Sequence, residues 1–406
     1  MNPDLDRLHP YPFQKLATLL RGVVPPPGLR PIDLSIGEPQ HPVAPFLRDR
    51  LAASLGGVTR YPTTRGQMDL RQAMARWLQS RFNLESVDPE QHVLPVNGTR
   101  EALFSIAQAV VDRSRQTAMP LVAMPNPFYQ IYEGATLMAG AEPIYVETRA
   151  DNGFIPDFGA LPTDILQRVQ LVYLCTPSNP TGTVLQEDRL IRLIELADRY
   201  DFVLASDECY SEIWYDAPPP GLLQAAQRLG RSDYRRCVVF HSLSKRSNMP
   251  GARTGFVAGD PDILNRYLKL RTYTGCATPP FIQDVATLAW SDETHVSENR
   301  LLYRQKRAEA LAILEPLLPV APPQAGFYLW LQVPGGGEAF ARSLYTEQAV
   351  TVLPGAYLGR DSVHGNPGRD YVRIAMVASL TDNREAMQRL ARCVENIQKM
   401  ETTPHV

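Results

Sequence analysis

The chain has 406 residues, of which 44% are hydrophobic and 21% charged, a composition typical of a folded protein large enough for two lobes. Its formal net charge of -2 gives no broad basic surface, so neither nucleic acid nor an anionic membrane is expected as a partner. The opening residues MNPDLDRLHPYPFQKL lack the basic start and apolar core of a signal peptide, and no segment reaches the roughly 18 apolar residues of a membrane span. We therefore expect a soluble, cytoplasmic protein.

The five cysteines are odd in number and widely spaced, with no CxxC motif and no paired histidines. Because structural zinc sites and disulfide frameworks need such clustering, neither is expected, and no metal site is predicted.

In chain order, a short helix over 10–22 and a strand at the start of 32–42 come first. Helices and strands then alternate. The predicted helices are 69–82, 99–112, 128–140 and 187–201, and the predicted strands are 92–96, 120–125, 141–147, 169–177, 202–208, 237–242 and 255–259. This alternation predicts an α/β fold, a mostly parallel sheet of about seven strands flanked by helices.

The pattern changes after Cys276, where a long helical stretch over 281–317 precedes the strand-like runs GFYLWLQV, AVTVLPG and YVRIAMVA and a final helix. This mixture predicts a smaller α+β lobe. We expect three parts: an N-terminal segment 1–45 that joins the small lobe, a large domain 46–275, and a small domain 276–406.

Polar residues follow several predicted strands at the point where each strand ends. Asn179 lies in TPSNPTG, Asp207 and Tyr210 lie in SDECY, and Lys245 lies in HSLSKRS. A glycine turn, NGT, opens the helix after 92–96, where the first amide groups can hold an anion. Ligands of parallel sheets bind beyond the carboxyl ends of the strands, so these residues predict one shared site.

In their order and spacing, SNPTG, SDECY and SLSKRSNMPGARTG resemble the signature of the fold-type I, pyridoxal phosphate-dependent aminotransferases of class I/II, and the likeness runs from about Leu34 to Arg373. The resemblance implies that Lys245 carries pyridoxal 5'-phosphate, because a lysine amine forms a Schiff base with an aldehyde, and that it later acts as a general base. Asp207 would keep the cofactor's ring nitrogen protonated, so that the ring accepts electrons.

The same resemblance implies roles for the other site residues. Asn179 and Tyr210 would hydrogen-bond the cofactor's phenolic oxygen, and Tyr129 would stack on its ring. Gly37 and Arg373 would bind the substrate's α-carboxylate, with Asn179 beside them. The expected phosphate ligands are Gly98, Thr99, Arg100, Ser242 and Arg253, with Tyr61 reaching across a homodimer interface to the partner's phosphate.

More narrowly, PYPF, IGEPQHP, PNPFYQIYEGATL and ASDECYSEI resemble the succinyldiaminopimelate aminotransferases of lysine and peptidoglycan precursor synthesis. This implies transfer of an amino group between glutamate and N-succinyl-2-amino-6-oxopimelate, with 2-oxoglutarate as the keto product. Such a substrate carries carboxylates far from the reacting end, and Arg65 and Arg271 are the residues we predict to bind them.

Other readings stay open. An aminotransferase for aspartate or aromatic amino acids, or a pyridoxal phosphate-dependent C-S lyase, would share the same cofactor residues. Ser242 and Lys245 also form the SxxK pattern of serine acyltransferases. In those enzymes a later KTG-like triplet lies on a separate strand across the cleft, but its counterpart here, Arg253 to Gly255, follows Lys245 too closely for that. A transcription regulator built on this domain would need a DNA-binding extension, and only some 30 residues precede the first core strand.

Overall fold

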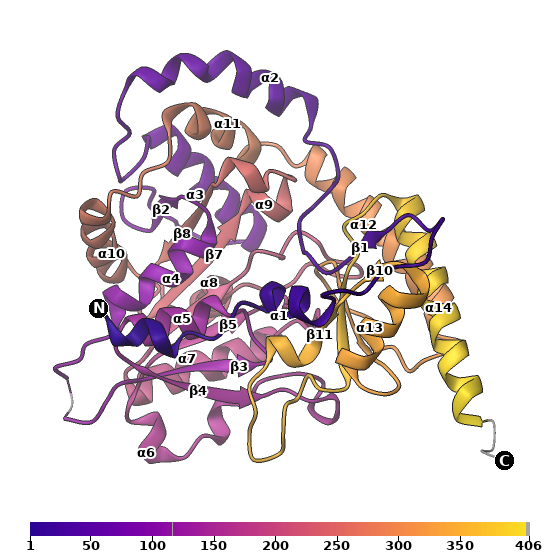
Figure 1. The fold of residues 1–406 in the computed structure, drawn as a ribbon. Coiled ribbons are helices and arrows are strands. Elements are labelled where there is room, and N and C mark those ends of the chain that lie inside the picture. The colour runs from indigo at the N-terminus through magenta and orange to yellow at the C-terminus, as the bar shows by residue number, and fades with distance from the viewer. Residues whose placement is uncertain (116, 403–406) are drawn as a thin grey trace.

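The computed structural model describes residues 1–115 and 117–402. A seven-stranded sheet forms the larger lobe, in the order β2-β8-β7-β6-β5-β3-β4 (Figure 1). The strands pair in parallel from β7 to β4, whereas β8 is antiparallel to both of its neighbours. Their bounds are β2 Val93–Val96, β3 Leu121–Asn126, β4 Glu142–Glu147, β5 Val169–Cys175, β6 Val203–Asp207, β7 Cys237–Ser242 and β8 Gly255–Gly259. The predicted mostly parallel α/β sheet is confirmed.

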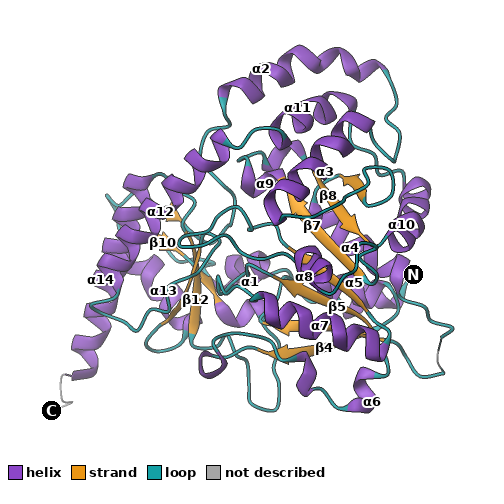
Figure 2. Ribbon diagram, turned by 180° about the vertical axis from the view of Figure 1, so that it is seen from behind, coloured by secondary structure: helices purple, strands orange, loops and turns teal. Residues whose placement is uncertain are grey.

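Helices cover both faces of this sheet (Figure 2), because its strands are apolar on both sides. One face packs against α3 (Met68–Phe82), α7 (Glu187–Tyr200), α8 (Leu222–Arg228) and α11 (Pro280–Trp290). The other face packs against α4 (Thr99–Val110), α5 (Ile131–Met138) and α10 (Pro261–Thr274). Each predicted helix of the large lobe is therefore present, within a few residues of its expected ends.

The smaller lobe contains a three-stranded antiparallel sheet in the order β11-β12-β9 and a two-stranded parallel pair, β1-β10. In this pair Ile32 lies opposite Val350, so the N-terminal segment adds a strand to the small lobe. The bounds are β1 Ile32–Asp33, β9 Tyr328–Gln332, β10 Val350–Thr351, β11 Leu353–Pro354, β12 Tyr371–Ala375, α12 Thr294–Leu314, α13 Gly337–Gln348 and α14 Leu380–Thr402.

Short elements connect these parts. They are α1 Pro12–Leu19, α2 Pro45–Ser54, α6 Thr163–Leu166 and α9 Leu243–Arg246, with the 3-10 turns η1 Pro3–Arg7, η2 Leu55–Thr59, η3 Ala150–Asn152, η4 Phe158–Ala160, η5 Pro250–Ala252 and η6 Gly355–Leu358. In the described residues no helix combines the length and apolarity needed to cross a membrane, and no group of acidic, His or Cys side chains is placed to hold a metal ion.

The helical stretch expected over 281–317 is divided into two helices, since α11 ends at Trp290 and α12 begins at Thr294. Val285 and Ala289 of α11 lie in the large-lobe core, whereas Leu311 and Leu314 of α12 lie in the small-lobe core. The two halves are thus held by different cores. We propose on this packing that the domain boundary lies between α11 and α12 and not at 275.

The N-terminal segment also touches both lobes. Arg7 donates to Glu142 of β4 at 2.8 Å, so η1 lies on the large lobe, while α1 packs beside β11 of the small lobe.

Candidate active site

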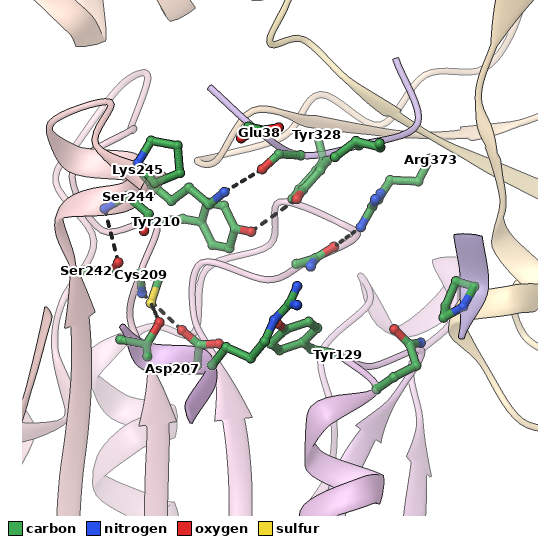
Figure 3. Close-up of a pocket in the computed structure, with 18 of the residues that line it drawn as sticks. Glu38, Tyr129, Asp207, Cys209, Tyr210, Ser242, Ser244, Lys245, Tyr328 and Arg373 are labelled. Carbon is green, nitrogen blue, oxygen red and sulfur yellow. Dashed lines mark hydrogen bonds between the residues drawn. The ribbon is translucent and has the colours of Figure 1, made fainter. Parts of the chain in front are cut away.

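A cavity of about 590 Å³ opens where the carboxyl ends of β5, β6 and β7 face the small lobe (Figure 3). Of the residues predicted for the site, those that line it are Gly37, Thr99, Arg100, Tyr129, Asn179, Asp207, Tyr210, Ser242, Lys245, Arg253 and Arg373. Residues from both ends of the chain and from both lobes therefore share one cavity.

Lys245 lies on α9, the short helix that follows β7. Ser242 begins this helix and its hydroxyl accepts from the Ser244 amide at 3.1 Å, which fixes the turn that carries the lysine. The Lys245 Nζ donates to the backbone oxygen of Gly37. Burial lowers the pKa of Lys245 to about 8, and the positive charge of Arg373 acts in the same direction. A lysine in this state can lose its proton near neutral pH.

Asp207 is the last residue of β6 and is buried. Its carboxylate accepts from the Tyr132 hydroxyl at 2.9 Å and from the Cys209 amide at 3.2 Å. Burial raises the pKa of Asp207, while these donors oppose that rise by stabilising the charged form. Tyr132 was missed in the sequence because its position on α5 is typical of a core aromatic residue.

One end of the cavity is built for an anion. Gly98 has a φ of +85° and immediately precedes α4, and a Cβ there would lie 2.2 Å from the Arg253 guanidinium. The hydroxyls of Thr99, Ser242 and Ser244 line the same cavity. A guanidinium, a helix N-terminus and hydroxyl donors together match the donor set that a phosphate requires.

The opposite side of the cavity is closed by Arg373 of β12. Its guanidinium donates to Asn179 Oδ1 at 3.0 Å and to the Ser35 backbone oxygen at 2.7 Å, and it lies 4.4 Å from the centre of the Tyr328 ring. Tyr328 in turn is 3.2 Å from Tyr210, hydroxyl to hydroxyl. Figure 3 shows Tyr210, Tyr328 and Arg373 facing the same space. Tyr328 was not predicted, since GFYLWLQV gives only a strand pattern.

Gly37 lies directly against Tyr328, and a Cβ at Gly37 would be 1.9 Å from the Tyr328 hydroxyl. The position therefore needs glycine for close approach of the backbone to the cavity.

Some predicted residues lie elsewhere. Tyr61 is fully exposed, with an exposed fraction of 102%, and does not line this cavity. Arg65 donates to the backbone oxygen of Glu90 at 2.7 Å, also away from the cavity. The prediction that Arg271 binds a distal carboxylate is wrong. Its side chain is fully buried and donates to Glu101 at 2.6 Å, so it is neutralised inside the protein.

The Arg100 side chain is not directed toward Arg253 and the end of the cavity that suits a phosphate. Its Nε donates to the Tyr129 hydroxyl at 2.7 Å, and its guanidinium lies 5.9 Å from the centre of the Tyr11 ring. Within the described chain this Nε contact is the one hydrogen bond of the Arg100 side chain. The guanidinium thus faces the cavity with donors to spare.

Comparison with known proteins agrees with this geometry. The family model of aminotransferase class I and II matches residues 30–392. The chain belongs to this family. Aminotransferases of this class depend on pyridoxal phosphate, and their substrates are amino acids and keto acids. The acyltransferase alternative is thereby removed.

Among the relatives of this aminotransferase, an LL-diaminopimelate aminotransferase of Moorella thermoacetica is 31% identical, with 91% of this chain and 93% of that protein covered. An aminotransferase structure from Neisseria meningitidis is 45% identical with a TM-score of 0.92, covering 97% and 99% of the two chains. A probable N-succinyldiaminopimelate aminotransferase of Thermus thermophilus is 25% identical with a TM-score of 0.82, covering 94% and 100%.

The cavity of this aminotransferase fits its cofactor. The end of the cavity that suits an anion offers Arg253 and the turn at Gly98. Asp207 offers a buried carboxylate, and Lys245 offers an amine that can lose its proton, in the same cavity. These are the three chemical groups that a phosphate, a ring nitrogen and an aldehyde would meet.

Proposed function

We propose that this aminotransferase exchanges an amino group between glutamate and N-succinyl-2-amino-6-oxopimelate, giving N-succinyl-LL-2,6-diaminopimelate and 2-oxoglutarate. The sequence resemblance to succinyldiaminopimelate aminotransferases supports this substrate, as does similarity to the Thermus thermophilus structure. The observation that carries most weight is that two guanidiniums, Arg373 and Arg100, line the cavity in addition to Arg253, which is proposed to bind the phosphate.

Each site residue has a proposed role. When bound, pyridoxal phosphate supplies an aldehyde that condenses with amines and a ring that accepts electrons released from the substrate's α-carbon. Lys245 would anchor it and then carry the proton that leaves the α-carbon. Asp207 would hold a proton on the ring nitrogen, Tyr129 would pack on the ring face, and Asn179 and Tyr210 would donate to the phenolic oxygen. Gly98, Thr99, Ser242 and Arg253 would bind the phosphate.

Arg373 would bind the α-carboxylate with its two terminal nitrogens, beside the Gly37 backbone. Its present acceptors, Asn179 Oδ1 and the Ser35 oxygen, hold the guanidinium in place before a substrate arrives. Preorganised donors lose little entropy on binding, which favours a correctly oriented substrate.

Arg100 replaces Arg271 as the proposed ligand of a distal carboxylate. Its Nε is held by Tyr129, which leaves its terminal nitrogens for the substrate. Because a carboxylate in a closed cavity is costly without a partner, loss of Arg100 would weaken binding of a substrate with a distal carboxylate more than of one without it. Arg65 lies outside the cavity of a single chain and keeps its predicted role only if the partner of a dimer brings it near.

A homodimer with shared sites is also proposed. Tyr61 is fully exposed in the single chain, and the apolar side chains of Leu55, Val58 and Tyr273 are exposed as well. An exposed apolar surface of this kind is typical of a protein interface, and it leaves Tyr61 free to reach a partner's phosphate.

We further propose a cytoplasmic location, since all five cysteines are free, as in a reducing compartment.

A second candidate substrate is free LL-diaminopimelate, named by the relatives of this chain. Its distal end carries an ammonium beside a carboxylate, and Glu38 of the same cavity would favour the ammonium. The succinylated substrate keeps the distal carboxylate, loses the ammonium charge and gains a second carboxylate on its succinyl group, so the two candidates differ in the net charge of the distal group.

The test is a comparison of kcat/KM for N-succinyl-LL-2,6-diaminopimelate, LL-diaminopimelate, aspartate and phenylalanine, each with 2-oxoglutarate. We expect the succinylated compound to be preferred, and Arg100→Gln to lower its kcat/KM by roughly tenfold or more while changing phenylalanine little. A higher kcat/KM for aspartate or phenylalanine would remove the diaminopimelate assignment and leave the aminotransferase intact.

A further inference from the structure

Lys306 of α12 is an unusual residue, since its side chain is buried, with 1% exposed, yet it has no carboxylate partner among the described residues. Its Nζ is 2.6 Å from His41 Nε2 and donates to the Val377 backbone oxygen at 3.3 Å. Burial lowers the pKa of Lys306 to about 8. A buried ammonium without a counter-charge costs free energy, so such a residue points to a role beyond packing.

His41 connects Lys306 to the active site. Its Nδ1 lies 2.7 Å from Asn299 Oδ1, and that same oxygen accepts from Asn248 at 3.1 Å. Since Asn299 Oδ1 can only accept, His41 Nδ1 carries the proton, and His41 Nε2 is left to accept from the Lys306 ammonium. Burial also lowers the pKa of His41, which keeps the ring neutral as this pattern requires. The donor order therefore runs from Lys306 through His41 to Asn299.

Asn299 completes the connection, because its Nδ2 donates to the backbone oxygen of Lys245 at 3.3 Å. A second route runs through neighbouring aromatic rings. The ring centre of His41 is 4.6 Å from that of Tyr303, the ring centre of Tyr303 is 5.4 Å from that of Phe327, and the Lys245 Nζ lies 5.3 Å from the Phe327 ring centre. Two independent sets of contacts thus join His41 to Lys245.

His41 is also the end of a segment that covers the cavity. We name residues 35–41 the strap. The Ser35 oxygen accepts from Arg373, the Gly37 oxygen accepts from Lys245, and Gly37 and Glu38 line the cavity. Ile36 in the strap is 45% exposed, whereas Ser35 and Pro39 are buried. One end of the strap is held by the small lobe, where Leu34 bonds Thr351 and Ala375, and the other end is held by His41. The Gly37 carbonyl that meets Lys245 lies between these two ends.

We propose that Lys306 and His41 are positioning residues for the active site: the Lys306 amine holds His41 in one tautomer, and His41 fixes both the strap and the backbone of Lys245. This inference rests on the proposed role of Lys245, and neither residue touches the cofactor or the substrate. The unpaired ammonium is explained by it, because a carboxylate in place of His41 would bind Lys306 but could not donate to Asn299.

The first test needs no turnover. Nitrogen-15 NMR of the full chain with labelled histidine reports the tautomer of each ring, and the His41→Phe spectrum assigns the His41 signals. We expect His41 to be neutral and protonated at Nδ1. A ring protonated at Nε2 would overturn the proposal, because Lys306 could then no longer donate to it.

The second test uses Lys306→Met and His41→Phe, which keep side-chain length and ring contact but remove the hydrogen bonds, with the exposed Lys269→Met as control. The rate at which an amine reagent labels Lys245 is followed against pH in the full chain freed of its cofactor. The charged and titratable groups facing Lys245 are Arg373, Arg100, Glu38 and Cys209, which no variant changes. A looser strap exposes Lys245, so both variants should raise the labelling midpoint by about one pH unit.

The two residues act in series, so the double variant should shift the labelling midpoint no further than either single variant. In the holoenzyme, each single variant should raise KM for the amino substrate roughly tenfold, more than it lowers kcat. Unshifted midpoints in folded single variants, or shifts that add in the double variant, would show that Lys306 and His41 serve stability alone. Because NMR and labelling need no substrate, they separate this failure from a wrong substrate assignment.

Discussion

The Tyr132 hydroxyl donates to Asp207 Oδ2 at 2.9 Å, across 75 residues of sequence and inside the large-lobe core. Tyr132 is buried and does not line the cavity, so this bond supplies the carboxylate with a donor from the protein core. It stabilises the charged form of Asp207, the form needed opposite a protonated ring nitrogen, against the effect of burial.

Tyr132→Phe should therefore lower kcat about tenfold, because a hydrogen bond to a charged group contributes roughly 1.5 kcal/mol or more. The matched control is Tyr173→Phe. That ring stacks on Tyr132 with centres 4.7 Å apart, and its hydroxyl donates to the Leu103 backbone oxygen at 2.6 Å. Thermal melts should show similar losses of stability for both variants, with kcat reduced only in the first. Equal kcat in the two would contradict the role of Tyr132.

Asp207→Ala should lower kcat by about 100-fold to 1,000-fold, as is found when one preorganised charge is removed from an active site. Asp207→Glu should retain part of the activity, since the carboxylate is kept and only displaced. Cofactor content, measured by absorbance after release in alkali, should stay high enough to show that catalysis and not binding is lost. Wild-type turnover in Asp207→Ala would refute the proposed contact with the ring nitrogen.

Lys245→Ala should lose nearly all turnover and, with it, the covalent cofactor. In the wild-type holoenzyme, borohydride should fix the cofactor to the peptide that contains Lys245, as read by mass spectrometry. The exposed Lys269→Ala serves as control and should be labelled at Lys245 like the wild type. Turnover that survives in Lys245→Ala would sink the assignment.

Arg373→Lys keeps the positive charge but loses the planar fork that bonds Asn179 and Ser35 at once. We expect kcat/KM for amino substrates to fall roughly tenfold to 100-fold, mostly through KM. Arg384→Lys, at an exposed ion pair with Glu309, provides the same change without effect on kinetics. Steady-state kinetics with glutamate tests both, and an unchanged KM in Arg373→Lys would exclude it as the carboxylate ligand.

The pH dependence of Lys245 follows from its lowered pKa of about 8. Burial disfavours the ammonium, so the reactive neutral amine appears as the pH rises through about 8, against about 10.4 for an unperturbed lysine. Reaction of the cofactor-free chain with pyridoxal phosphate should therefore accelerate between pH 7 and 9 and then level off. A rate that keeps rising to pH 10 would show that Lys245 is not perturbed.

The sequence alone determined the α/β class and the residues at the strand ends. Strand and helix periods are local properties, and Asn179, Asp207 and Lys245 each follow a buried apolar run directly, so their shared cavity at one sheet edge follows from topology. Sequence reasoning did not find Tyr132, Tyr328 or the Lys306 and His41 pair, since each looks like a core or surface residue until its distant partner is known. Arg271 was assigned wrongly because its charge is visible in the sequence but the buried Glu101 contact is not. Only tertiary structure decides which donor meets which acceptor, because that choice depends on packing between residues far apart in the chain.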